Sequence, residues 1–146
     1  MTTSLDERTE RIAAEFSELE PRERLELLLE FAEKLPPLPE RYRAERDAGL
    51  GRVPECQTPV FLWVRLEDGR VHMDADVAPE SPTVKGFVSV LVEIFDGASC
   101  EEAIAFEPNF VRRFGLAEAL GMVRMRGLEA IAHVIGRKVA AAANDT

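Results

Sequence analysis

The chain has 146 residues and a mass of 16.3 kDa, which predicts a single domain over residues 1–146 with one hydrophobic core. With 46% hydrophobic and 31% charged residues, the composition is that of a folded globular protein and excludes wholesale disorder. The net charge of −9 argues against nucleic acid and anionic membrane surfaces as the main partners.

The small number of cysteines and histidines argues against a zinc or Fe–S protein. The two cysteines, Cys56 and Cys100, are too few for a disulfide scaffold, a four-cysteine zinc site or an Fe–S cluster. His72 and His133 stand alone without metal-ligand spacing, so we expect no metal and no cofactor. No basic start leads into an apolar stretch, and no segment approaches about 20 uninterrupted apolar residues. We therefore expect a cytoplasmic protein, whose thiols stay reduced.

The first third of the chain predicts three helices, at about residues 5–19, 21–35 and 39–48. A capping box of Ser4 and Glu7 begins the first helix. Pro36-Pro37 ends the second, because neither proline can continue the helical hydrogen-bond ladder. The apolar residues expected to face the core are Leu5, Ile12, Phe16 and Leu19, followed by Leu25, Leu28, Leu29, Ala32 and Leu35.

The middle of the chain predicts a β-hairpin with strands at residues 58–66 and 70–77. Asp68-Gly69 is a strong signal for the tight turn between them. Strict alternation in the second strand predicts one buried face and one face toward solvent or a site. The residues expected on the buried face are Val60, Leu62, Val64, Leu66, Val71, Met73, Ala75 and Val77.

The rest of the chain predicts helices again. Ser81 as N-cap and Pro82 in the first turn open the most hydrophobic helix, which ends near Asp96-Gly97 and forms the core beneath the sheet. Further helices are expected after the Ser99–Glu102 capping box and at residues 108–114 and 122–141. Gly127 in the last helix predicts a close backbone contact. This order predicts an α+β fold, with helices packed on a small antiparallel sheet.

A reactive thiol is predicted where the chain enters the first strand. Cys56 lies between Pro54 and Pro59, which fix φ and remove backbone donors, so the segment is a loop anchored to a stiff strand. An isolated cysteine is often a small buried hydrophobe, but the polar neighbours of Cys56 favour a chemical role. Because only the thiolate is a useful nucleophile, its pKa matters: Arg52 would lower it and Glu55 would raise it.

Three segments resemble the SufE family of sulfur acceptor proteins: PECQTP at residues 54–59, PESPTVKG at 79–86 and LGMVRMRGL at 120–128. The resemblance runs from about residue 5 to about residue 138 in the family's order and spacing. It implies a SufE/IscU-like fold and Cys56 as the acceptor of persulfide sulfur from a cysteine desulfurase, for delivery to an Fe–S assembly scaffold. The chain would then activate a SufS-like desulfurase, and pyridoxal phosphate would belong to that partner.

The resemblance also implies supporting residues around the cysteine. Arg124 would lie near a cavity toward which Cys56 is turned, where a guanidinium would stabilise a thiolate or persulfide anion. Spacing alone favours a surface arginine at that position. Gln57 follows the cysteine in the family motif, and Asp76 matches an acidic position at the end of the second strand. The plain interpretation of Lys85-Gly86, which also fits the family, is a snorkelling lysine beside a close-packed glycine.

The residues by themselves leave two other functions open. One is an Fe–S scaffold or metal-binding module of similar fold, against which the small number of cysteines weighs. The other is a thiol redox sensor that uses Cys56 with Cys100 as the resolving thiol. Without the resemblance, the sequence indicates only a reactive thiol on a loop. The resemblance supplies the substrate and the partner.

Overall fold

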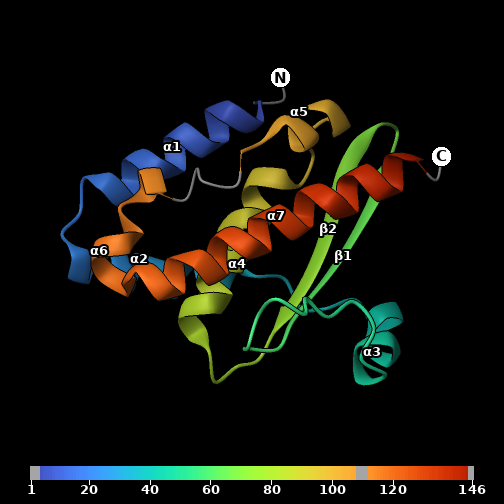
Figure 1. Ribbon diagram of the computed structural model, residues 1–146, viewed down its shortest axis with the longest axis horizontal. Helices are drawn as coiled ribbons and strands as arrows, with labels where there is room; N and C mark the ends of the chain where they lie inside the picture. The colour runs from blue at the N-terminus through green and yellow to red at the C-terminus, as the bar shows by residue number, and fades with distance from the viewer. Residues whose placement is uncertain (1–3, 108–111, 145–146) are drawn as a thin grey trace.

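The computed structural model describes residues 4–107 and 112–144. Helices pack against a two-stranded antiparallel sheet, so the predicted α+β fold is confirmed (Figure 1). The elements are α1 (Leu5–Ser17), α2 (Pro21–Lys34), α3 (Glu40–Asp47), β1 (Val60–Glu67), β2 (Arg70–Val77), α4 (Pro82–Phe95), α5 (Cys100–Ala105), α6 (Leu116–Leu120) and α7 (Met122–Asn144). Within the described ranges, no helix combines the length and the hydropathy needed to cross a membrane.

The hairpin forms in the predicted register. Val60 pairs with Val77 at one end and Glu67 with Arg70 at the other. Asp68 and Gly69 both have positive φ, at 52° and 74°, as a tight hairpin turn requires. The predicted inner residues face α4 and α7, which contact β2 and β1 respectively. In Figure 1, α7 runs diagonally across α4 and along the hairpin.

Helix α4 is the centre of the core, as predicted. Gly86 is buried where α4 crosses α2, and a Cβ added there would collide with the carbonyl oxygen of Leu28. The close-packed glycine is therefore confirmed. Ser81 is the N-cap residue of α4 and Pro82 stands in its first turn, as predicted, but the Ser81 hydroxyl accepts no capping hydrogen bond. Ser4, with ψ at 161°, accepts one from the backbone N–H of Glu7.

Two details of the first helices differ from the prediction. Phe31 is 2% exposed and faces the core, whereas Leu29 is 44% exposed. The ring of Phe16 stacks on those of Phe31 and Phe114, with centroids 5.9 and 5.6 Å away, and this aromatic column orients α2. Leu19 lies beyond the end of α1.

The segment before α7 was predicted incompletely. Residues 108–111 of the expected helix at 108–114 lie outside the described residues, and residues 112–114 form one 3₁₀ turn. The short helix α6 follows, although no helix was predicted there. It is bounded by Gly115 and Gly121, whose φ values are 69° and 86°. In the sequence, two glycines so close together indicate turns, so the short helix between them could not be predicted.

Main-chain hydrogen bonds along the free edge of β1 position the segment that carries Cys56. The backbone N–H of Leu62 donates to Gly51 O, and that of Val53 donates to Val60 O, both at 2.8 Å. Val53 and Val60 are fully buried. The chain is thus fixed to the sheet just before residue 54 and again at residue 60.

Candidate functional site

Cys56 lies in a loop of residues 54–59 whose two ends are fixed and whose middle projects from the sheet. The Val53–Val60 hydrogen bond closes the base, and Cys56 N donates to Val53 O at 3.3 Å. Pro54 and Pro59 contribute no N–H to the ladder, and Pro59 pairs only through its carbonyl, which accepts from Ala78 N at 3.2 Å. The base of the loop is therefore fixed by main-chain hydrogen bonds to β1.

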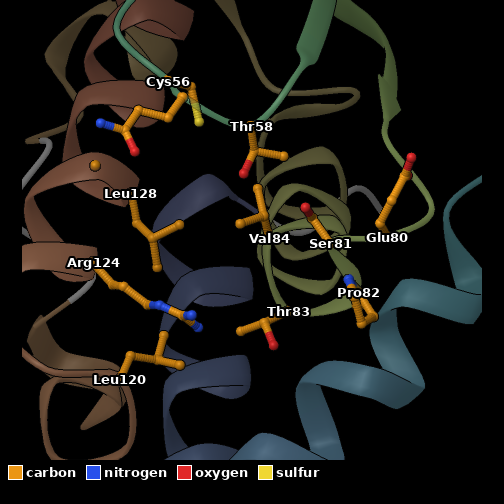
Figure 2. Close-up of a pocket in the computed structure, with 12 residues that line it drawn as sticks. Cys56, Thr58, Glu80, Ser81, Pro82, Thr83, Val84, Leu120, Arg124 and Leu128 are labelled. Atoms are coloured by element: carbon orange, nitrogen blue, oxygen red, sulfur yellow. The ribbon is translucent and has the colours of Figure 1, made fainter.

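The loop closes one side of a cavity of about 360 Å³. Figure 2 shows the sulfur of Cys56 directed toward this space, with side chains from α4 and α7 opposite. The three sequence segments that resemble the SufE family meet here, although they are far apart in the chain. The lining residues are Cys56, Gln57, Thr58, Glu80, Ser81, Pro82, Thr83, Val84, Leu120, Arg124, Gly127 and Leu128.

Two of the three predicted supporting residues line the same cavity as Cys56. Gln57 does so from the loop, and Arg124 does so from the first turn of α7. The guanidinium of Arg124 extends across the space toward α4 (Figure 2). Leu120, Leu128 and Val84 supply apolar wall. The cavity can therefore hold a small sulfur group against apolar surface with one cation nearby.

The resting thiol of Cys56 is disfavoured from ionising. Burial raises the pKa of Cys56, and this effect outweighs a hydrogen bond from the backbone of Thr58 and the positive charge of Arg52, both of which lower it. The carboxylate of Glu55 accepts a hydrogen bond from Arg137 Nη2 at 2.7 Å, which lowers the pKa of Glu55. Near neutral pH the free protein holds Cys56 as a protonated, partly buried thiol.

Comparison with known proteins decides the family. The SufE family model, described as an Fe–S metabolism associated domain, matches residues 10–139. The chain belongs to the SufE family.

Relatives and a solved structure agree with the assignment to SufE. A SufE-like protein of Mycobacterium tuberculosis H37Rv is 34% identical over 129 residues, covering 88% of each chain. The cysteine desulfuration protein SufE of Plasmodium falciparum is 24% identical over 100 residues, covering 66% of this chain and 39% of its own. The solution structure of a hypothetical protein from Thermus thermophilus superposes with a TM-score of 0.80 at 36% identity, covering 94% of this chain and 96% of its own.

Asp76, the third supporting residue expected from the SufE resemblance, does not line the cavity. Strand alternation places it on the outer face of the hairpin, opposite Phe61. There its carboxylate pairs with Arg46 Nη1 of α3 at 3.0 Å. Its place in the fold is thus to attach α3, the helix that precedes the cysteine loop, to the hairpin.

Phe61 and Trp63, the aromatic residues of β1, also lie on the outer face and outside the cavity lining. Trp63 stacks on Tyr42 of α3, with ring centroids 4.9 Å apart. These rings help to hold α3 on the hairpin. The apolar surface near the sulfur comes instead from α4, α6 and α7.

Cys100 lies at the other end of the hairpin. Its backbone N–H donates to the carbonyl of Gly69 in the turn, at 3.2 Å, whereas the Cys56 loop joins β1 at Val60. Strand rise puts these two ends about 20 Å apart. A disulfide requires Cα atoms within about 7 Å, so Cys100 cannot resolve an oxidised Cys56 in this fold. The geometry weighs against the redox-sensor alternative.

The expectation for Gly127 is wrong. Outside its own helix, a Cβ added at Gly127 would meet no atom of residues 4–107 and 112–144 within 4 Å, so the expected backbone contact is not made by that part of the chain. The residue lines the cavity instead, where the missing side chain leaves space open. Among the side chains that the structure describes, no three of His, Cys, Asp or Glu are grouped so as to hold a metal ion.

Proposed function

We propose that this SufE-family protein is a sulfur acceptor, which takes persulfide sulfur from a cysteine desulfurase onto Cys56 and delivers it to Fe–S cluster assembly. The observation that carries the proposal is that Cys56 faces a cavity lined by Arg124 and by all three segments resembling the family. Membership in a family associated with Fe–S metabolism supports it. A relative named as a cysteine desulfuration protein supports the sulfur-transfer role.

The transfer step is a displacement at sulfur. The Cys56 thiolate attacks the outer sulfur of a persulfide on the desulfurase cysteine, a new S–S bond forms to Cys56, and the donor cysteine leaves as a thiolate. Cys56 then carries the persulfide until a scaffold thiolate takes the outer sulfur in the same way. No net oxidation occurs, and the reaction needs access to the attacked sulfur more than acid–base groups. Pyridoxal phosphate chemistry belongs to the desulfurase.

The cavity accounts for how a carrier would protect its sulfur between encounters. In the resting loop, Cys56 is partly buried and faces the apolar side chains of Val84 and Leu128. Arg124 offers a cation to the persulfide anion. The desulfurase would favour an outward loop, a population shift driven by its contacts with the exposed form. Leaving the cavity also removes the burial that raises the pKa of Cys56, so exposure and activation coincide.

Mass spectrometry after incubation with a cysteine desulfurase and cysteine tests this function. The protein should gain one sulfur atom on the peptide that contains Cys56, and a reductant should remove it. The peptide that contains Cys100 is the internal control and should stay unmodified. Sulfur on Cys100, or none on either peptide while the desulfurase turns over, would refute the proposal.

A further inference from the structure

The tip of the cysteine loop is tied to α7 by an ion pair next to the nucleophile. Glu55 directly precedes Cys56, and its carboxylate accepts a 2.7 Å hydrogen bond from the guanidinium of Arg137. The two residues are 82 positions apart in sequence, so the contact links two separate parts of the fold. The loop is thereby held at two places: at its base by β1 and at its tip by α7.

Helix α7 also forms a wall of the cavity, through Arg124, Gly127 and Leu128. The contact between Glu55 and Arg137 therefore ties the loop to the same helix that lines the cavity, at a position C-terminal to the lining residues. The base cannot give way easily, because Val53 and Val60 are fully buried and hydrogen-bonded to each other. To carry Cys56 outward, the loop must swing about this base, and its tip must leave Arg137.

The exposure of the pair fits a contact that breaks readily. The side chains of Glu55 and Arg137 are 37% and 57% exposed, and ion pairs so exposed contribute little to stability. Such a pair can bias the loop without trapping it. We propose that the Glu55–Arg137 ion pair is a latch that holds Cys56 in the cavity at rest, and that Arg137 is a positioning residue for sulfur transfer. The proposal rests on the proposed role of Cys56 as the acceptor.

A latch can be separated from a purely electrostatic effect on the thiol. Replacing Glu55 with Gln removes a negative charge near Cys56, which by itself would favour the thiolate. Replacing Arg137 with Gln removes a positive charge, which by itself would disfavour the thiolate. An electrostatic role therefore predicts opposite changes in thiol reactivity. A latch predicts that both replacements release the loop and raise the reactivity of Cys56.

The experiment is the rate at which a bulky maleimide labels Cys56 in the isolated full-length chain, for wild type, Glu55→Gln, Arg137→Gln and the double variant. In each single variant, the maleimide should label Cys56 about two- to fivefold faster than in wild type. An exposed ion pair shifts an equilibrium by about that factor. The double variant should label no faster than the faster single variant, because one contact is lost in all three. Cys100 in the same molecule reports any general loosening and should label at an unchanged rate.

Arg112→Gln is the matched control. Arg112 pairs with Glu129 of α7 at 2.9 Å, so this variant makes the same change in charge and breaks an ion pair to α7 without touching the loop. Labelling of Cys56 should stay at the wild-type rate. Opposite changes in the two single variants, unchanged rates, or additive effects in the double variant would each overturn the latch. The assay contains no desulfurase, so it stands apart from the mass-spectrometric test: a protein that never gains sulfur refutes the proposed function whatever the labelling rates show.

Discussion

Cys56 and Cys100 are both partly buried thiols near opposite ends of one hairpin, and their backbones are held in different ways. Cys100 begins α5, whose capping box joins Ser99 and Glu102 reciprocally. Its own N–H is bonded to the hairpin turn, and Glu102 also accepts from Leu5 N at 2.9 Å. Around Cys56 the main-chain bonds are concentrated at the base of the loop, and the tip is held by one exposed ion pair to α7.

This difference shows that burial alone does not distinguish the two thiols. A thiol within a capped helix that is bonded to two other segments cannot move without breaking those bonds. A loop with a firm base and a weakly held tip can move as a unit. Its thiol can then be sheltered in the cavity or exposed to solvent. The arrangement around Cys56 suits a group that must be sheltered and then presented.

The largest expected effect separates the two thiols directly. Cys56→Ser should abolish sulfur acceptance and any stimulation of the desulfurase, because a hydroxyl cannot form a persulfide. Cys100→Ser should leave both at wild-type level. The measurement is persulfide formation and desulfurase turnover for each variant, and a dead Cys100 variant beside an active Cys56 variant would show the site assignment to be wrong.

A smaller effect is expected at the cavity wall. Arg124→Ala should slow sulfur transfer about fivefold, the loss expected when an exposed guanidinium near an anion is removed. Single-turnover transfer rates measure this, with unfolding by urea as the check on folding. Arg126→Ala is the matched control, since Arg126 is an exposed arginine of the same helix outside this cavity. Equal rates for the Arg124 variant and wild type would make Arg124 a surface residue without a role.

At the end of the hairpin near Cys100, a substitution should change the stability of the fold and not the rate of sulfur transfer. Glu102→Ala removes the capping box of α5 and the bond to Leu5 N, and should lower the free energy of unfolding by about 1–2 kcal/mol. These hydrogen bonds lower the pKa of Glu102, so its contribution is present above the unfolded pKa and is lost as pH falls through the folded one. Urea unfolding at neutral and acidic pH should show the difference from wild type shrinking in acid. A difference that stays constant with pH would contradict the role assigned to the carboxylate.

The smallest effect concerns the pH dependence of the loop thiol. Because burial raises the pKa of Cys56, its labelling rate should still be rising with pH where an unfolded thiol has already reached its plateau. A small thiol reagent, applied to native protein and to protein in urea, measures the two profiles. The native profile should lie at higher pH, and a native profile at lower pH would show that the charges near Cys56 outweigh its burial.

The fold was largely predictable because its signals are local. Alternating apolar residues and Asp68-Gly69 determine the hairpin and its register, and the long apolar stripe determines α4. Leu29 and Phe31 show the limit of this reasoning. Both are apolar residues of α2. Phe31 is the buried one because its ring packs on Phe16, a tertiary contact that the local sequence does not reveal.

The candidate site was predictable in part. The proline-bounded loop marked Cys56, and the family resemblance supplied Arg124 and Gln57, which the structure brings to one cavity. Arg137 had no signal, since nothing local pairs an arginine on a long helix with a glutamate 82 residues earlier. Asp76 was expected near the cysteine because it matches an acidic position of the family, but it lies on the outer face of the hairpin and pairs with Arg46.

The account's central claim is that the free protein shelters Cys56 and that the desulfurase draws it out. Labelling of both cysteines with a bulky maleimide, followed over time with and without the desulfurase, tests it most directly when the desulfurase cysteine is replaced so that no sulfur is transferred. The account predicts slow labelling of Cys56 in the free protein, faster labelling with the desulfurase bound, and no change at Cys100. Rapid and complete labelling of Cys56 in the isolated protein, unaffected by the desulfurase, would contradict it.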